Sequence, residues 1–368
     1  MYILGVNLSH HPSTCLLKDG DVVFYIEEER ISKHKYAHIE DEEHVVLDDG
    51  TVKEFGGGYY GVKYLKDIDY IDVIVFASFG SKYHDPRRID LVLETLKREG
   101  IEWGKFEYDE YEHHIYHAYN SFYASGFDES LAIVMDGGGA LDQETMENKT
   151  GFFREGESVY QCSYPDNVVE LHKNYTALED LTVDPIVRGT RTFSNHIPSA
   201  WLFSKTCEVF GFYSRGGEAG KLMGMSAYGT STSDLPWYNQ NNISLNGNIS
   251  NELLEWDVST FESRANFCFK LQQQTKMHTL KFIGDAISKY NPKNIVLSGG
   301  YFMNCVNNYA YLKAFPEINF FVDPIAFDSG TAIGAAKKVW YNITGDTTVR
   351  KFNNLYFGPD NAYLPCNK

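Results

Sequence analysis

The stretch Leu131-Ala132-Ile133-Val134-Met135-Asp136-Gly137-Gly138-Gly139 carries most of the information about the fold. Its run of apolar residues is typical of a short strand that is buried on both faces. An acidic residue at the carboxyl end of such a strand points into the usual ligand crevice of an α/β sheet. The glycines allow backbone N–H groups to approach a phosphate or another oxyanion, although a plain turn into a hairpin would also explain them.

A comparable order of elements begins at the N-terminus, where the turn Lys18-Asp19-Gly20-Asp21 joins two predicted strands as a hairpin. The order strand, polar glycine turn, strand, strand and then helices occurs from Tyr2 and again from Leu131. It predicts two related α/β lobes without a sequence repeat. The predicted strands are 2–7, 13–17, 22–27, 71–77, 131–135, 151–154, 159–162, 294–297 and 318–322. The predicted helices are a segment that begins near residue 86 and segments 111–125, 198–210, 266–290, 304–315 and 331–341. Segment 40–61 is predicted to be an inserted ribbon or a mobile loop, 164–195 to be irregular and 234–259 to be a surface excursion.

Composition excludes several classes of protein. The chain has 368 residues, 43% hydrophobic and 23% charged, which fits a globular protein of two domains or one bilobal domain. Its 33 basic and 50 acidic residues give a net charge of −17, so a nucleic-acid partner is not expected. The apolar runs are too short to span a membrane, and the first residues lack the basic start of a signal peptide. The 6 widely spaced cysteines, without C-x-x-C, indicate reduced thiols in the cytoplasm.

The strongest local signal is His113-His114-x-x-His117. On a helix, His113 and His117 share a face, and His114 and His117 could also converge. Two imidazoles one turn apart are a common arrangement of metal ligands, although such pairs also occur on surfaces without a ligand. Asp136 and Asp328 add carboxylates, and an ordinary helix N-cap is the alternative for Asp328.

Two further segments combine glycines with polar residues. The segment 216–224 contains Gly217, Glu218, Gly220 and Lys221 but lacks the spacing of a P-loop. The second segment places Ser298, Gly299, Gly300 and Asn304 between a predicted strand and a predicted helix. Both patterns indicate close approach of the backbone, either to a ligand or to a packed helix. His11 lies in the turn after the first strand and suits general base catalysis, and Lys35 follows a charged run and could contact a phosphate.

Together these motifs resemble the O-carbamoyltransferase family of antibiotic biosynthesis and nodulation-factor decoration. The matching segments are 3–7, 11–14, 27–35, 113–118, 134–137, 216–224, 296–304 and 328–336. The resemblance implies an actin/hexokinase-type (ASKHA) α/β fold with two ribonuclease-H-like lobes around a nucleotide cleft, a fold shared with threonylcarbamoyl transferases. We therefore expect a first lobe at 1–126, a second lobe with insertions at 127–350 and a linker-like tail at 351–368.

The resemblance also implies the chemistry. Such enzymes pass a carbamoyl group from carbamoyl-adenylate, made from carbamoyl phosphate and ATP, to a hydroxyl of a small-molecule acceptor. By resemblance, the metal ligands are His113, His117, Asp136 and Asp328, and the metal is iron. His11 takes the acceptor proton, Glu218 is a second catalytic residue, and Lys35 contacts phosphate. The implied nucleotide contacts are Gly137, Gly138, Gly139, Gly217, Gly220, Lys221, Ser298, Gly299, Gly300 and Asn304.

Two features depart from the family pattern. Pro12 replaces the aspartate that usually follows the catalytic histidine, and Asp19 or Asp21 could substitute for it in orienting His11. Family members continue into a YrdC-like domain that makes the adenylate, whereas this chain ends at Lys368, so we expect a separate YrdC-like partner. A homodimer is also possible. The alternatives are a non-catalytic subunit that binds nucleotide and metal, and a threonylcarbamoyl transferase acting on tRNA, which the acidic surface disfavours.

Overall fold

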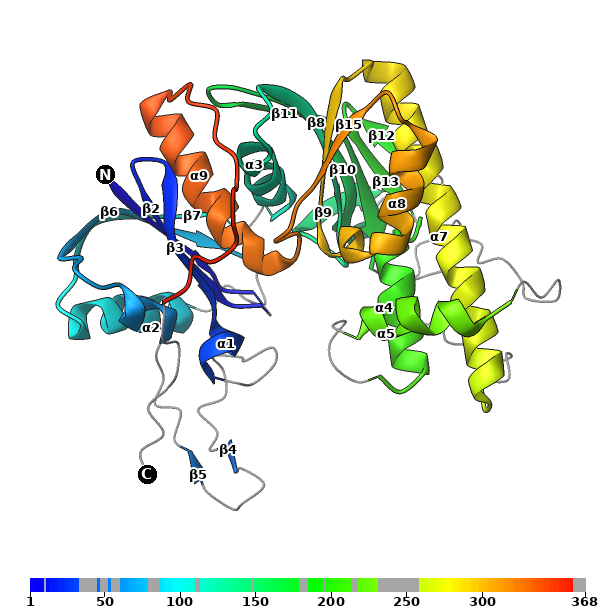
Figure 1. Cartoon of the computed structure of the whole chain (residues 1–368), viewed down its shortest axis with the longest axis horizontal. Coiled ribbons are helices and arrows are strands. Elements are labelled where there is room, and N and C mark those ends of the chain that lie inside the picture. Colours follow the sequence, from blue (N-terminus) through cyan, green and yellow to red (C-terminus); the bar gives the residue numbers. More distant parts are fainter. Residues whose placement is uncertain are drawn as a thin grey trace. The chain divides into compact units, whose positions relative to one another are not determined.

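The computed structural model divides the chain into two compact units, which are described one at a time (Figure 1). Unit 1 comprises Met1–Gly126, Tyr164–Asp166 and Phe327–Lys368, and unit 2 comprises Phe127–Ser163 and Asn167–Ala326. The structure describes residues 1–9, 11–32, 45–46, 52–53, 60–78, 86–109, 113–146, 149–178, 185–194, 196–212, 218–230 and 258–359. Within these ranges, none of the helices combines the length and the apolar character that crossing a membrane requires.

Unit 1 contains a five-stranded sheet in the order β3-β2-β1-β6-β7. The strands β1, β2 and β3 form an antiparallel meander, and β6 and β7 continue the sheet in parallel. The strands are β1 (Tyr2–Asn7), β2 (Ser13–Lys18), β3 (Asp21–Glu27), β6 (Tyr70–Ala77) and β7 (Glu102–Asp109), with a separate ribbon of β4 (Val45–Val46) and β5 (Val52–Lys53). The helices are α1 (Glu28–Ser32), η1 (Tyr60–Tyr64), α2 (Pro86–Arg98), α3 (His113–Ser125), η4 (Asp328–Gly330) and α9 (Thr331–Thr344).

The residues of β1 explain how helices pack on both faces of this sheet. Leu4 and Val6 are fully buried in a core cluster that also contains Val92 and Leu96 of α2. Because side chains alternate along a strand, Gly5 faces the opposite side. A Cβ atom at Gly5 would lie 2.0 Å from the carbonyl oxygen of Ala332, so only glycine lets α9 approach β1 this closely.

Unit 2 repeats this topology. The order β11-β10-β8-β14-β15 is again an antiparallel meander followed by two parallel strands, with β13 and β12 added beyond β11. The strands are β8 (Glu129–Met135), β9 (Leu141–Met146), β10 (Lys149–Ser163), β11 (Asn167–Ala177), β12 (Ile186–Arg188), β13 (Arg191–Ser194), β14 (Asn294–Ser298) and β15 (Asn319–Val322). The helices are α4 (Ser199–Val209), α5 (Ala219–Met225), η2 (Ser226–Tyr228), α7 (Phe261–Tyr290), η3 (Gly300–Met303) and α8 (Cys305–Ala314). Two sheets of this order confirm the predicted pair of ribonuclease-H-like folds.

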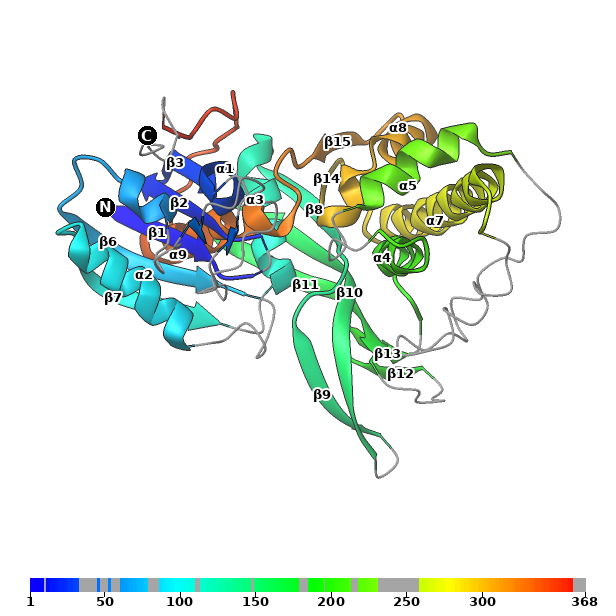
Figure 2. The ribbon, with the colours of Figure 1, turned by 90° about the horizontal axis from the view of Figure 1, so that it is seen from below.

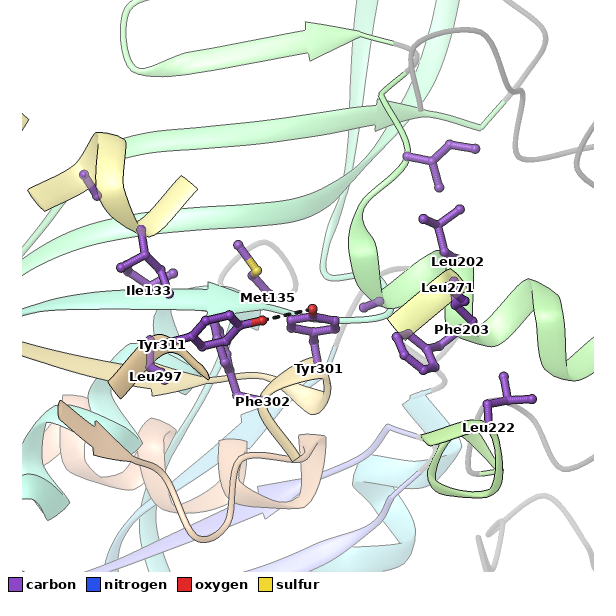
Figure 3. Packing of buried hydrophobic residues seen from close by; sticks show 14 of the residues in the cluster. Ile133, Met135, Leu202, Phe203, Leu222, Leu271, Leu297, Tyr301, Phe302 and Tyr311 are labelled. Atoms are coloured by element: carbon purple, nitrogen blue, oxygen red, sulfur yellow. Dashed lines mark hydrogen bonds between the residues drawn. The ribbon is translucent and has the colours of Figure 1, made fainter. Parts of the chain in front are cut away.

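The core of unit 2 lies between its sheet and its helices. Figure 3 shows Ile133 and Met135 of β8 near Tyr301 and Tyr311, whose hydroxyl groups are 3.1 Å apart. The side chains of Leu202 and Leu271 extend the same cluster toward α4 and α7 (Figure 3). The strand that leads into the Asp136 loop is therefore packed against aliphatic side chains and a buried pair of tyrosines.

Three features of the fold differ from the sequence predictions. Segments 151–154 and 159–162 belong to one long strand, β10, whose far half pairs with β9 as a ribbon (Figure 2). The prediction of an irregular segment at 164–195 is wrong, because β11, β12 and β13 form there. Strand β7 was not predicted. In addition, the structure groups α9 with unit 1, where it packs on β1, β2 and β6, although the expected second lobe ran to residue 350.

Candidate metal centre

The side chains of His113, His117 and Asp328 converge within unit 1. The Nε2 atoms of His113 and His117 are 3.2 Å apart, and they lie 3.7 and 3.9 Å from Oδ1 of Asp328. All three side chains are buried. Metal–ligand bonds of about 2.1 Å place neighbouring ligand atoms about 3.0–3.4 Å apart, so these residues fit a transition metal with small adjustments.

Helix geometry decides which histidines converge. The rings of His113 and His117 have centroids 4.8 Å apart, one turn apart on α3, whereas those of His114 and His117 are 6.4 Å apart. His114 is buried on a different part of the helix surface. The pair at i and i+4 therefore faces Asp328, and the pair at i and i+3 does not.

Asp328 is held by side chains at and just after the end of β1 and by the first residue of α9. Asn7 Nδ2 donates a hydrogen bond to the carbonyl oxygen of Asp328 at 3.0 Å, and Ser9 Oγ donates to its Oδ2 at 3.3 Å. Thr331 Oγ1 also donates to that carbonyl at 2.6 Å. These contacts leave Oδ1 directed at the histidines. The N-cap of α9 is Gly330, so the alternative of Asp328 as an ordinary side-chain N-cap does not hold.

His11 lies in the same buried network. Asn7 Nδ2 donates to the carbonyl oxygen of His11 at 2.8 Å, so one amide group ties the backbones of His11 and Asp328 together. The ring of His11 packs edge-on against Phe327, the residue before Asp328, with centroids 3.9 Å apart. His11 is 9% exposed, and both nitrogen atoms of its ring are buried.

The suggestion that Asp19 or Asp21 orients His11 is wrong. Both acids lie at the β2–β3 turn, whereas His11 precedes the opposite end of β2, about 20 Å away along a six-residue strand. Asp19 pairs with the N-terminal amine at 2.7 Å, and Asp21 pairs with Arg350 at 2.9 Å. Asn7 and Phe327 position His11 instead.

Helices α3 and α9 pack closely beside this centre (Figure 1). A Cβ atom at Gly334 would lie 1.9 Å from the carbonyl oxygen of Tyr116, which sits between the two histidines. At the other end of α3, the buried Lys337 donates to the carbonyl oxygen of Tyr123 at 2.7 Å. A cation there favours the helix C-terminus, where carbonyl groups lack partners within the helix. These contacts from α9 fix the helix that carries the histidines.

In unit 2, Asp136 follows β8 and binds the next glycine loop. Its Oδ1 accepts a hydrogen bond from the backbone N–H of Gly300 at 2.9 Å. Gly299 has φ +97°, and a Cβ atom there would lie 2.2 Å from the carbonyl oxygen of Met135, so close packing of the two loops requires this glycine. Gly138, at φ +148°, lies against Arg154, whereas a Cβ atom at Gly137 would meet only Ser204 at 3.8 Å. Backbone at Gly137 is therefore the more open part of this loop.

The remaining predicted contacts fall into three groups. Lys35 and Gly217 lie outside the described residues. Gly220 belongs to α5, and a Cβ atom there would meet open space, while Lys221 forms an ion pair with Glu218. Asn304 caps α8, and its amide group exchanges two hydrogen bonds with Gln272. Ser298 Oγ donates to Asp323 at 2.8 Å, which holds the start of the glycine loop.

Comparison with known proteins shows the family to which the chain belongs. Residues 89–337, more than half of the chain, match the family described as carbamoyltransferase N-terminus. The chain belongs to this carbamoyltransferase family. The matched range contains His113, His117, Asp136 and Asp328, whereas His11 and Asn7 lie before it.

Related proteins share modest identity with the chain. The nodulation protein NolNO of Sinorhizobium fredii is 23% identical, with 95% of this chain and 49% of that protein aligned. Uncharacterized proteins of Synechocystis sp. and Methanocaldococcus jannaschii are 24% and 25% identical, each over 97% of this chain and 60% of the relative. The chain therefore spans about half to three fifths of the length of these relatives.

Solved structures with a similar fold have lower sequence identity to the chain. HypF of T. kodakarensis is 13% identical with a TM-score of 0.49, covering 94% of this chain and 48% of that protein. The activator of 2-hydroxyisocaproyl-CoA dehydratase from Clostridium difficile is 11% identical with a TM-score of 0.46, covering 93% and 95%. Both are far below the identity at which function could be compared.

The sequence analysis missed the residues that support the metal ligands. Asn7, Ser9 and Ser13 are fully buried polar residues at the end of β1 and the start of β2. Ser13 Oγ donates to the carbonyl oxygen of Ser329 at 2.7 Å, which fixes the turn after Asp328. The signal was present in the sequence, since Asn7 and Ser9 interrupt an otherwise apolar strand where a core would continue.

Proposed function

We propose that the chain transfers a carbamoyl group from carbamoyl-adenylate to a hydroxyl group of a small-molecule acceptor. Membership of the carbamoyltransferase family supports this reaction class. The observation that carries the proposal is the convergence of His113, His117 and Asp328 beside His11, through the shared hydrogen bonds of Asn7. This arrangement combines ligands for a Lewis acid with a candidate general base.

The proposed metal at His113, His117 and Asp328 is iron. Two imidazoles and carboxylate oxygens suit iron and related transition metals. A metal bound there would polarise the carbamoyl carbonyl group, which favours attack at the carbon. Ser9, Asn7 and Thr331 would keep the carboxylate of Asp328 directed at it.

In the proposed step, His11 accepts the proton of the acceptor hydroxyl as its oxygen bonds to the carbamoyl carbon. The bond between that carbon and the phosphate oxygen breaks, and AMP leaves with the electron pair. The products are the carbamoylated acceptor and AMP. The ring of His11 is held against Phe327, so its position is fixed before the acceptor binds.

The adenylate is proposed to bind the glycine segments of unit 2. The open backbone at Gly137 and Gly220 suits close approach of a phosphate, and Gly139 and Lys221 are further proposed contacts. Gly138 and Gly299 are used in close packing and Asn304 caps α8, so these residues are proposed to shape the loops rather than to contact the adenylate directly. A catalytic role for Glu218 would require it to leave its ion pair with Lys221.

Formation of carbamoyl-adenylate from carbamoyl phosphate and ATP is proposed to occur outside these 368 residues, on a YrdC-like partner. The experiment compares two reactions of the purified chain. The first contains carbamoyl phosphate and ATP, and the second contains preformed carbamoyl-adenylate and a panel of hydroxyl acceptors. We expect AMP release and a carbamoylated acceptor only in the second case. Pyrophosphate release by the chain alone, dependent on carbamoyl phosphate, would contradict the proposed division of labour.

The variant His11→Asn tests the assigned base. It should bind carbamoyl-adenylate as tightly as the wild type but lose transfer by about 10²–10⁴-fold, because a general base acts in the chemical step. Binding is measured by calorimetry, and transfer by mass spectrometry of the acceptor. If wild-type protein binds the adenylate and transfers to none of the acceptors, a non-catalytic subunit becomes the better description. Equal transfer rates in wild type and variant would remove His11 from the reaction.

A further inference from the structure

A second cluster of ligand-type side chains lies within unit 2. Glu157 on β10, His196 before α4 and His278 on α7 present ligand atoms that all lie within 4.8 Å of one another. The Nε2 atom of His278 is 2.9 Å from Oε1 of Glu157, and that of His196 is 3.8 Å from Oε2. Three separate elements thus direct these atoms at one point.

The surroundings hold the cluster in place. Asn174 on β11 donates from Nδ2 to Oε2 of Glu157 at 3.1 Å, which fixes the carboxylate. Thr176 Oγ1 donates to the carbonyl oxygen of His196 at 2.7 Å, so the segment before α4 is tied to β11. The imidazole rings of His196 and His278 have centroids 4.9 Å apart. The ligand set is therefore supported by groups outside it, as metal sites commonly are.

Burial leaves one side of the cluster open. The side chain of Glu157 is fully buried, whereas those of His196 and His278 are 19% and 21% exposed. A cation could reach the histidines from solvent and contact a carboxylate below them. Three protein ligands and an exposed fourth position are typical of metal sites that also hold water or a small ligand.

We propose that Glu157, His196 and His278 form a second metal site for a divalent ion such as Zn²⁺, independent of the centre on His113 and His117. Two imidazoles and a carboxylate are a common zinc ligand set. Ligand atoms in a tetrahedral zinc site lie about 3.4 Å apart, close to the separations of 2.9 and 3.8 Å seen here. The proposal rests on unit 2 alone and does not depend on carbamoyl transfer.

Protonation of His278 is the alternative to a metal bound at this cluster. Burial raises the pKa of Glu157, but the charge and hydrogen bond of His278, with His196 and Asn174, outweigh it and lower the pKa to about 2. Burial likewise lowers the pKa of His278, but Glu157 outweighs it and raises the pKa above its ordinary value. A protonated His278 would pair with Glu157 without any metal. The test must therefore measure metal binding directly.

The experiment uses the full chain after treatment with a chelator. Zn²⁺ is added, free ions are removed, and bound zinc is measured by elemental analysis in His117→Gln protein, which lacks a ligand of the first centre. We expect one bound zinc. Adding His278→Gln or Glu157→Gln should remove it, whereas His172→Gln, a histidine of the same unit outside the cluster, should retain it. Asn174→Ala should weaken zinc binding about 10–100-fold.

Circular dichroism and thermal unfolding of each apo variant identify any that fail to fold. If a cluster variant does not fold, Co²⁺ is added to His117→Gln protein and its visible absorption is measured. A tetrahedral site with nitrogen ligands gives Co²⁺ an intense visible absorption. Loss of that absorption on competition with Zn²⁺ would support the site. Absence of zinc and of the cobalt spectrum in His117→Gln protein, or unchanged zinc binding in His278→Gln protein, would overturn the proposal.

Discussion

Asn7 shows how a single buried amide can organise a reactive centre. Its Nδ2 group donates to the carbonyl oxygens of His11 and Asp328, at 2.8 and 3.0 Å. Its Oδ1 atom accepts from the backbone N–H of Ser9 at 2.9 Å. The amide thus fills its hydrogen-bonding capacity with backbone groups, which need partners when buried.

Replacing this amide tests its role. We expect Asn7→Ala to lower the free energy of unfolding by about 2–4 kcal/mol, because buried backbone groups lose their partners. It should also weaken metal binding at the His113 centre, since Asp328 loses a support. Urea unfolding and metal titration measure the two effects. Asn319→Ala is the control, because that amide is exposed and should change stability by less than about 0.5 kcal/mol. Equal effects of the two substitutions would contradict this role.

Asp346 provides a pH-dependent contact in unit 1. It accepts hydrogen bonds from the backbone of Thr348 at 2.9 Å, from Arg350 at 2.6 Å and from Trp340 at 3.0 Å. Burial raises the pKa of Asp346, but these hydrogen bonds outweigh it and lower the pKa below its ordinary value. Because the pKa in the unfolded chain is about 3.9, the stabilisation is present above that pH and is lost as the pH falls through the lower folded value.

Asp346→Asn should therefore destabilise the protein by about 1–2 kcal/mol at neutral pH. The difference from wild type should shrink as the pH falls below about 4, because Asp346 then becomes protonated in the unfolded chain while it is still ionised in the folded protein. Urea unfolding at neutral pH and near pH 3 checks this dependence. A difference that stays constant, or grows toward low pH, would show that the charge of Asp346 does not contribute.

At the level of secondary structure, the packing of α9 on α3 brings the proposed metal ligands of unit 1 together. His113 and His117 are separated by one helical turn, which the sequence reveals directly. Asp328 lies far along the chain and joins them only because α9 packs on α3 through Gly334. The pairing of the histidines was therefore predictable from local spacing. The supports at Asn7 and Ser9 were not, because they depend on long-range packing.

Substitutions at two helical glycines separate packing from helix propensity. Gly334→Ala should destabilise the protein by about 1–3 kcal/mol and weaken metal binding, because its Cβ atom would lie 1.9 Å from a backbone oxygen. Gly284→Ala in α7 should stabilise it by about 0.5–1 kcal/mol, because its nearest neighbour, Phe315, would lie at 3.5 Å. Thermal and urea unfolding measure both. The same sign for the two changes would contradict the close crossing.

The missed strands have physical explanations. In β11, Lys173 is buried and pairs with the buried Glu155, and Asn174 contacts Glu157, so charged and polar residues occupy positions where an apolar alternation is expected. In β7, an edge strand, Phe106 is half exposed among charged residues. Strands such as β1, β8 and β14 were predicted correctly, because both of their faces are covered and their sequences are continuously apolar.

At the scale of the whole molecule, the same sheet order occurs in both units. The first unit adds histidines and Asp328 beside its sheet, and the second adds glycine loops after β8 and β14. The repeated topology was predictable because its buried strands follow the same order twice. The candidate site residues differ between the units, since His113 and His117 lie on α3 whereas the glycine loops follow strands of unit 2.

We propose that carbamoyl transfer depends on a metal held by His113, His117 and Asp328. The most direct measurement is single-turnover transfer from preformed carbamoyl-adenylate before chelation, after chelation and after reloading with Fe²⁺. We predict that wild-type protein loses transfer on chelation and regains it on reloading, whereas His117→Gln protein shows little transfer in any state. Undiminished transfer by metal-free wild-type protein, or by reloaded His117→Gln protein, would contradict the claim.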